Sequence, residues 1–197
     1  MADLPTQKYD YHHYEGWLPL PDEYFKTLKR TVPFTQGKVR VYGKLHDERR
    51  LTSMHVRYPK EGKTYKYSGT VKKVKPFTEE MEKIAKKIKK KFGIEVDMCL
   101  CNLYEDGIRN IGYHSDSESD LSSANGGPHI FSISLGATRK FRLRKKTESS
   151  GFHEELVLKS GDLVHMRGNC QKLYKHSIPV EKKVTEPRIN LTFRVSA

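Results

Sequence analysis

The second half of the chain, from Ile94 onward, is a series of short segments in which apolar and polar residues alternate. A period of two is typical of β-strands that bury one of their two faces. Gly, Asn and Ser residues separate the segments, which read EVDMCLCNLYED, HIFSISLG, KFRLRKK, ELVLKSGDLVHM and PRINLTFR. Short strands at such intervals favour a β-sandwich or jelly roll over a fold in which strands and helices alternate.

Two helices are expected before these strands. Thr78 is placed to cap a helix over EEMEKIAKKIKKKFG, in which apolar residues recur at helical spacing and Gly93 marks the end. Asp22 is expected to cap a shorter helix over EYFKTLKR. The predicted fold is therefore mainly β, with flanking N-terminal helices.

Length and charge limit the remaining possibilities. The chain has 197 residues, which suits a single domain over residues 1–197, and a formal net charge of +13. The excess of Lys and Arg favours a polyanionic partner, with nucleic acid first and an anionic membrane surface second. No apolar run approaches the roughly 18 residues of a membrane span. The first residues lack a signal-peptide core, and three cysteines are too few for a disulfide framework, so we expect a nuclear or cytoplasmic protein.

Residues 38–70 contain two hairpin-like stretches, KVRVYGKLHDERR and KTYKYSG, that are rich in Tyr and basic residues. They have no evident apolar face. One interpretation is an exposed β-ribbon that only covers the sheet. The other is a flap that grips a nucleic acid, because aromatic rings stack on bases and arginines meet phosphates.

The stretch GYHSDSE places His114 and Asp116 two residues apart, on one face of an extended segment. A second histidine would complete the two-His, one-carboxylate triad of non-haem Fe(II) oxygenases. The downstream candidates are His129, His153, His165 and His176. The first two lie in loop-like sequence. His165 in LVHM and His176 in KLYKHSIP remain open at this point, and His165 could equally be a buried structural residue.

The closing strand presents a polar face of four residues: Arg188, Asn190, Thr192 and Arg194. This face could meet solvent, or it could line a pocket for an anion. Fe(II) oxygenases of this type use 2-oxoglutarate, a dicarboxylate, and Arg is the bidentate, permanently charged partner that a carboxylate prefers. Asn102 and Tyr104 could add hydrogen bonds from a neighbouring strand while Cys99, Cys101 and Leu103 pack in the core on its opposite face.

The motifs NLYEDGIRNIGYHSDSE, FSISLGATRKFRLR, LYKHSIP and PRINLTFR together resemble the AlkB family of Fe(II)/2-oxoglutarate-dependent nucleic-acid dealkylases. The resemblance extends from about residue 38 to residue 195 and is greatest to the eukaryotic members that act on double-stranded DNA. It implies a double-stranded β-helix (jelly-roll) core over about residues 94–197. It also implies that residues 38–70 form a β-hairpin lid for nucleotide recognition.

The resemblance assigns roles to the polar residues. His114, Asp116 and His176 would bind Fe(II), with 2-oxoglutarate and O2 as co-substrates. Arg188 would pair with the distal carboxylate of 2-oxoglutarate, helped by Tyr104. The metal-bound end would lie near Asn102, Asn190 and Arg194, with Thr192 on the same wall and Arg194 also steadying Asp116.

Four further residues would contact the substrate: Tyr42, Tyr65, Tyr67 and Glu118. Tyr42, in place of a more apolar family residue, would enter the base stack as a wedge. Tyr65 and Tyr67 would stack on a flipped base beside His114, and Glu118 would lie near that base.

The resemblance implies an oxidative demethylase that repairs 1-methyladenine and 3-methylcytosine in DNA, with duplex DNA favoured. The products would be formaldehyde, succinate and CO2. The alternatives are a demethylase of RNA or single-stranded DNA, a 2-oxoglutarate oxygenase that acts on protein, and a nucleic-acid binder without catalysis. We expect a monomer.

Overall fold

The computed structural model describes residues 10–41, 44–59, 64–67, 70–116, 121 and 128–196, and for residues 39–41, 45, 64–67 and 70–72 only the backbone. The strands are β1 (Tyr11–Tyr14), β2 (Thr35–Val41), β3 (Lys44–Val56), β4 (Thr64–Tyr67), β5 (Thr70–Pro76), β6 (Met98–Tyr104), β7 (Ile111–His114), β8 (Ile130–Gly136), β9 (Arg139–Lys145), β10 (Glu154–Leu158), β11 (Leu163–Met166), β12 (Tyr174–Ile178) and β13 (Arg188–Arg194). The helices are α1 (Pro21–Thr31), α2 (Glu79–Phe92) and α3 (Cys170–Leu173).

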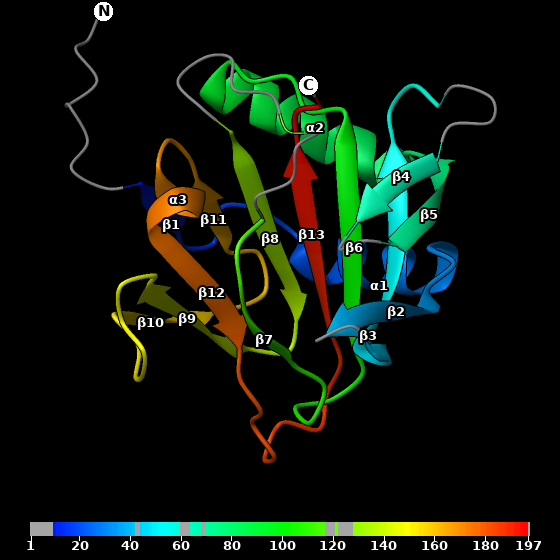
Figure 1. Cartoon of the computed structure of the whole chain (residues 1–197). Helices are drawn as coiled ribbons and strands as arrows, with labels where there is room; N and C mark the ends of the chain where they lie inside the picture. Colours follow the sequence, from blue (N-terminus) through cyan, green and yellow to red (C-terminus); the bar gives the residue numbers. More distant parts are fainter. Residues whose placement is uncertain are drawn as a thin grey trace, which may run out of the picture.

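The strands form two sheets (Figure 1). The large sheet has the order β1-β11-β8-β13-β6-β3-β5-β4, with β2 paired to β3, and the small sheet has the order β10-β9-β12-β7. Every pairing within the described residues is antiparallel except that of β3 with β5. This arrangement confirms the predicted mainly β fold. The large sheet also takes in β1, β3 and β5 from the N-terminal half of the chain.

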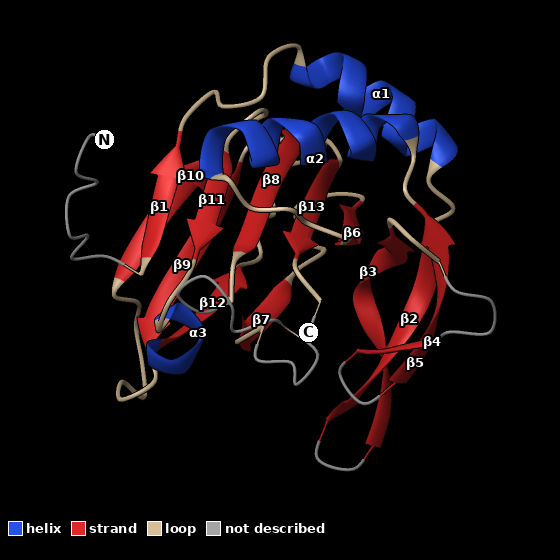
Figure 2. Ribbon diagram, turned by 90° about the horizontal axis from the view of Figure 1, so that it is seen from above, coloured by secondary structure: helices blue, strands red, loops and turns tan. Residues whose placement is uncertain are grey.

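Helices α1 and α2 lie side by side on one face of the large sheet, and the small sheet covers the other face (Figure 2). The Thr78 hydroxyl accepts a hydrogen bond from the Met81 amide at 3.3 Å, and Gly93 ends α2 in the left-handed conformation with φ +72°. Both terminal signals are therefore confirmed. The buried residues of α2 are Met81, Ile84, Ala85 and Ile88.

The predicted cap of α1 is wrong. The helix begins at Pro21, so Asp22 lies inside its first turn and Leu20 occupies the cap position without a side-chain hydrogen bond. Proline is favoured at the first helical position because its fixed φ suits the helix and its missing N–H would have no intrahelical partner there. Asp22 instead places a negative charge near the positive end of the helix dipole.

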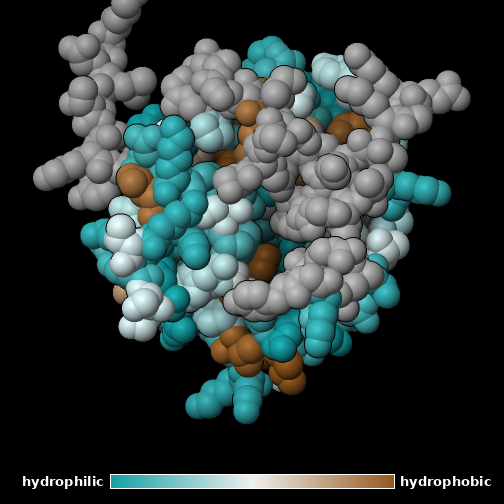
Figure 3. Space-filling model, viewed as in Figure 1, coloured by the Kyte–Doolittle hydropathy of each residue, from teal (hydrophilic) through white to brown (hydrophobic). Residues whose placement is uncertain are grey.

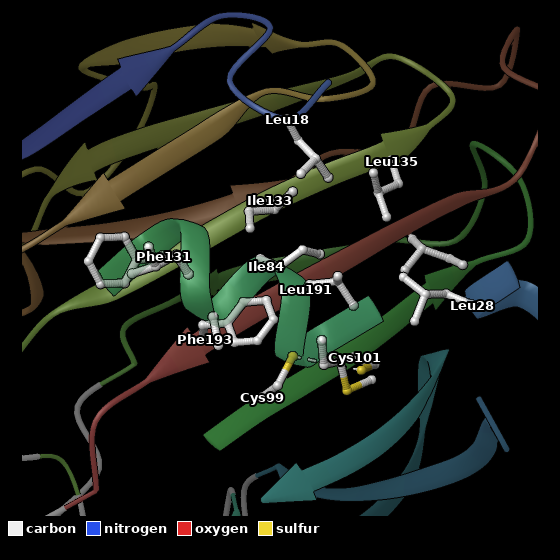
Figure 4. Close-up of a cluster of buried hydrophobic side chains, with 14 of the residues drawn as sticks. Leu18, Leu28, Ile84, Cys99, Cys101, Phe131, Ile133, Leu135, Leu191 and Phe193 are labelled. Carbon is white, nitrogen blue, oxygen red and sulfur yellow. Dashed lines mark hydrogen bonds between the residues drawn. The ribbon is translucent and has the colours of Figure 1, made fainter. Parts of the chain in front are cut away.

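The hydrophobic core fills the space between the large sheet and the two helices (Figure 4). Strand β13 contributes Ile189, Leu191 and Phe193, none of which is exposed to solvent. Cys99 and Cys101 of β6 lie in the same core as predicted, and no disulfide joins them. Burying each large apolar side chain contributes roughly 1.5–3 kcal/mol, so this face fixes the position of β13.

The opposite face of β13 carries the four polar residues of the closing strand, yet every residue of the strand is buried. The small sheet covers this face, which excludes the interpretation of a polar face exposed to solvent. Arg188 and Arg194 are each only 1% exposed. Two buried guanidinium groups on one strand require partners within the interior.

The extended segment predicted at GYHSDSE corresponds in part to β7, whereas β1, β12 and α3 have no counterpart in the sequence predictions. The predicted hairpin KVRVYGKLHDERR corresponds to β2 and the start of β3, but β3 continues to Val56 and pairs with β6. None of the helices in the described ranges is both long and apolar enough to cross a bilayer.

Replacing Thr78 with Ala is expected to lower the free energy of unfolding by about 1 kcal/mol, because the Met81 amide loses its acceptor. Urea unfolding followed by circular dichroism measures the change. Thr78→Ser keeps the hydroxyl and serves as the control. Equal stability of the Ala and Ser variants would contradict the role of this cap.

Candidate active site

Two neighbouring strands of the small sheet bring the metal-binding residues together. In the antiparallel pair of β7 and β12, His114 lies directly opposite His176, and Asp116 follows β7 by two residues. Each residue offers a ligand atom, and these atoms lie within 4.8 Å of one another. The Asp116 Oδ1 atom is 3.8 Å from His114 Nε2, and Oδ2 is 3.7 Å from His176 Nε2. Both rings therefore aim Nε2 at one carboxylate.

Neighbouring groups fix the orientation of each ligand. His114 Nδ1 lies 2.9 Å from the Gly112 carbonyl, which can only accept, so this nitrogen carries the proton and Nε2 keeps its lone pair. The His176 ring stacks on Phe141, with centroids 5.3 Å apart. The Asp116 amide donates to Gln171 Oε1 at 2.7 Å, which ties the segment after β7 to α3.

The protonation states of the three residues suit a cation. Burial acts to raise the pKa of Asp116, but Arg194, His176 and His114 outweigh it, and the pKa falls to about 2. Arg194 Nη2 lies 3.2 Å from Asp116 Oδ1. Burial lowers the pKa of His176 to about 3 and also lowers the pKa of His114. At neutral pH the site thus offers two neutral imidazoles and one carboxylate, the donor set that Fe(II) accepts in a facial triad.

His165, the other histidine left open by the sequence, lies on the helix side of the large sheet. Its ring stacks on Phe131 at 4.2 Å and meets Phe92 of α2 at 5.1 Å. Its Nε2 atom is 3.0 Å from His129 Nδ1. His165 is therefore a buried residue of the packing between sheet and helix, and His176 is the third ligand.

A pocket between the two sheets joins the triad to the polar face of β13. All six residues predicted to contact 2-oxoglutarate line it: Asn102, Tyr104, Arg188, Asn190, Thr192 and Arg194. The face of the molecule that bears β7 is hollowed near its middle, and the described residues around the hollow are mostly hydrophilic (Figure 3).

Asn190 belongs to a hydrogen-bonded row across four strands, β8, β13, β6 and β3. Its amide nitrogen donates to Ser132 Oγ at 2.8 Å, and its oxygen accepts from Thr192 Oγ1 at 3.0 Å and from Asn102 Nδ2 at 3.4 Å. Arg50 of β3 donates from Nε to Asn102 Oδ1 at 2.7 Å. The row holds this wall of the pocket rigid, because each buried amide has its partners.

Arg188 differs from its neighbours. Its Nη2 donates to Ser134 Oγ at 2.9 Å, but within the described residues Nε and Nη1 have no hydrogen-bond partner. Burial lowers its pKa to about 10, with Tyr104 opposing the shift, so the guanidinium stays charged at neutral pH. A buried cation with two unpartnered nitrogen atoms needs an anion. The residues present therefore fit a carboxylate in this part of the pocket.

Some residues of the site escaped the sequence analysis. Ser132 and Ser134 alternate with apolar residues in FSISLG, and this pattern could have shown that β8 has one polar face in the interior. Arg50 and Gln171 gave no such signal. Arg50 of β3 contacts Asn102 in the pocket wall, and Gln171 of α3 contacts Asp116, and neither contact can be inferred from the sequence pattern.

The predicted substrate contacts are not described. Tyr42 and Glu118 lie outside the described residues. Tyr65 and Tyr67 belong to β4, which pairs with β5, and only their backbone is described.

Comparisons with known proteins agree with this geometry. Residues 11–194 match the 2OG-Fe(II) oxygenase superfamily. The chain is 37% identical over 183 residues to the DNA oxidative demethylase ALKBH2 of Bos taurus, covering 88% of this chain and 63% of that protein. The ALKBH2 of Mus musculus is 35% identical over 183 residues, covering 88% of this chain and 74% of that protein. The chain belongs to the AlkB family.

A second relative is the alpha-ketoglutarate-dependent dioxygenase alkB homolog 3 of Bos taurus, 33% identical over 88% of this chain and 60% of that protein. The chain thus spans less than two thirds of the length of the two Bos taurus relatives. Among solved structures, that of OsALKBH1 superposes with a TM-score of 0.64 and 18% identity, covering 95% of this chain and 99% of that one. At this identity the likeness supports the fold alone.

Changing His176 to Ala is expected to weaken Co(II) binding by at least about 10-fold, because one of the ligands of the triad is lost. His165→Ala is expected to bind Co(II) as the wild type does, since His165 lies on the helix side of the sheet. Visible absorption during anaerobic Co(II) titration measures both, with near-ultraviolet circular dichroism to verify folding. The reverse ranking would refute the assignment of the third ligand.

Proposed function

We propose that this AlkB-family chain is an oxidative demethylase that removes methyl groups from 1-methyladenine and 3-methylcytosine in DNA, with duplex DNA favoured. One observation carries the proposal: a single buried pocket combines the His-Asp-His triad with a charged guanidinium, that of Arg188, which has donors to spare. A protein that only bound nucleic acid would have no need of an anion site beside a metal site. The similarity to proteins named DNA oxidative demethylase supports the choice of substrate.

His114, Asp116 and His176 hold Fe(II) in this proposal. With 2-oxoglutarate and O2, the bound iron supplies the oxidation in which one oxygen atom enters a methyl C–H bond of the base and the other enters succinate as CO2 leaves. The hydroxymethyl group then breaks its C–N bond and departs as formaldehyde, while the nitrogen regains its unmodified form. Arg194 keeps Asp116 ionised and oriented throughout.

The polar face of β13 would bind 2-oxoglutarate. Arg188 receives the distal carboxylate and Tyr104 supports it, because the Arg188 guanidinium carbon lies 5.4 Å from the centre of the Tyr104 ring. The metal-bound end of the diacid lies near Asn102, Asn190 and Arg194, with Thr192 on the same wall. Ser134 already uses one nitrogen of Arg188, which leaves the other two for the ligand.

The nucleic acid would meet residues 38–70, as the recognition lid of a single catalytic domain over residues 1–197 with a core over about 94–197. Tyr42 would fill the gap in the duplex, Tyr65 and Tyr67 would stack on the flipped base, and Glu118 would lie beside it. Extruding a base costs a few kcal/mol, and least for a lesion that already disrupts pairing. The net charge of +13 supplies contacts to the backbone that do not depend on sequence.

RNA or single-stranded DNA is the alternative substrate, supported by Tyr42 in place of a more apolar wedge. A protein substrate fits less well with the basic charge and the Tyr-rich ribbon. A monomer in the nucleus or cytoplasm stays a prediction.

The protein, purified without oxygen and supplied with Fe(II), 2-oxoglutarate and air, is expected to demethylate 1-methyladenine faster in duplex than in single-stranded DNA. Mass spectrometry of the same oligonucleotide in both forms follows the methyl group, and His114→Ala, which lacks a metal ligand, should be inactive. Loss from single strands alone would move the substrate to open DNA or RNA. Succinate release without demethylation of either form would refute the proposed repair of 1-methyladenine in DNA and would direct the search to another substrate.

Replacing Tyr42 with Ala is expected to slow repair of duplex DNA more than repair of single strands, because only the duplex has a gap to fill. Tyr42→Phe keeps the aromatic ring and is the matched control. Initial rates on the two substrates give the ratio. Equal losses on both would remove the wedge role.

A further inference from the structure

Arg139 of β9 is a buried cation that the proposed chemistry does not use. Its side chain is 1% exposed. The guanidinium donates to four backbone carbonyls, those of Asp106 at 3.0 Å, Gly107 at 3.4 Å, Arg109 at 3.0 Å and Pro179 at 2.7 Å. Its Nε donates to Glu181 Oε2 at 3.0 Å.

These contacts join two loops that are distant in the sequence, residues 105–110 and 179–187. The Glu181 amide donates to the Gly107 carbonyl and the Gly107 amide donates to the Val184 carbonyl, each at 2.8 Å. The same Glu181 Oε2 also accepts from the Lys140 amide at 2.9 Å. Gly107 is required here, because a Cβ atom would lie 2.0 Å from the Glu181 carbonyl oxygen. Arg139 and Glu181 together thus act as a clamp, which we call the loop clamp.

The loop clamp lies where three pocket strands meet the two loops. Strand β6 ends at Tyr104, directly before the first loop. Strand β12, which carries His176, leads into the second loop, and β13 begins at Arg188 directly after it. The position of the Arg188 backbone therefore depends on how the loops are held.

The ring of Tyr104 contacts two guanidinium groups. Its ring centre is 5.7 Å from the Arg139 carbon and 5.4 Å from the Arg188 carbon. Cations over an aromatic face are attracted by the ring quadrupole. Arg139 and Arg188 thus share the Tyr104 ring as a neighbour, in addition to the link that the loops make between them.

We propose that Arg139, with Glu181, positions Tyr104 and Arg188 to receive the distal carboxylate of the diacid co-substrate. This inference rests on the proposed function. Only Arg can hold the loops this way, since its five N–H donors form a planar fork that the single ammonium of Lys does not reproduce. Arg139 would make the same contacts if it only stabilised the fold. The test must therefore measure ligand binding, which a positioning role changes selectively for the ligand that has a distal carboxylate.

The test compares 2-oxoglutarate with oxalate, which can chelate the metal but has no distal carboxylate. Both are titrated calorimetrically into Co(II)-loaded protein without oxygen. Arg139→Lys and Glu181→Gln are expected to weaken 2-oxoglutarate binding by roughly 10-fold, by analogy with the loss of a group that orients a ligand-binding residue. Oxalate binding is expected to stay at the wild-type level, because oxalate does not reach Arg188. The matched controls are Arg142→Lys and Glu155→Gln, which alter another Arg–Glu pair on β9 and β10.

The outcomes separate cleanly. Equal losses for both ligands, or no loss for either, would overturn the positioning role. If Arg139→Lys does not fold, the milder Glu181→Gln, which keeps the four carbonyl contacts, decides the matter alone. Wild-type protein that binds no 2-oxoglutarate would refute the proposed function itself, whereas wild-type binding with unaffected variants would refute only the loop clamp.

Discussion

The ion pair between Arg194 and Asp116 joins the two sheets at the metal centre. Arg194 ends β13 of the large sheet, and Asp116 follows β7 of the small sheet. A carboxylate buried without a cation would become protonated, since removing charge from water is costly. Arg194 opposes that effect, so Asp116 remains an anion in the interior. The metal centre thus depends on Arg194, which is not itself a ligand. Because Arg194 and Asp116 come from different sheets, the charge of Asp116 depends on how the two sheets are aligned.

The two faces of strand β13 fix the position of Arg194 relative to Asp116. Ile189, Leu191 and Phe193 are packed under the helices, so the strand cannot slip. A shift of one residue would exchange the faces, placing arginines in the core and apolar groups in the pocket. The burial of these apolar side chains therefore determines where Arg188 and Arg194 lie in the pocket, although the apolar side chains take no part in binding. The hydrogen-bonded row around Asn190 then adds precision that apolar packing cannot supply.

Sequence reasoning succeeded where the signal is local. Thr78 and Gly93 mark the ends of α2 because caps depend on neighbouring residues, and β13 shows its two faces because alternation does not depend on partners. The cap predicted at Asp22 was wrong because Pro21 begins the helix one residue earlier. The third ligand could not be chosen from residue patterns, since His165 and His176 differ only in which strands they pair with. Family resemblance supplied what the patterns lacked. The contacts of Gln171 with Asp116 and of Arg139 with the Pro179 carbonyl join segments that are distant in the sequence, so no local pattern predicted them.

The spare donors of Arg188 have a thermodynamic consequence. A buried guanidinium with unmet hydrogen bonds lowers the stability of the folded chain, and an anion that satisfies them restores it. Any ligand that binds only the folded state raises its stability in proportion to the logarithm of ligand concentration. An anion that binds Arg188 is therefore expected to raise the free energy of unfolding as its concentration rises, so the pocket would be both the binding site and a source of stability for the fold.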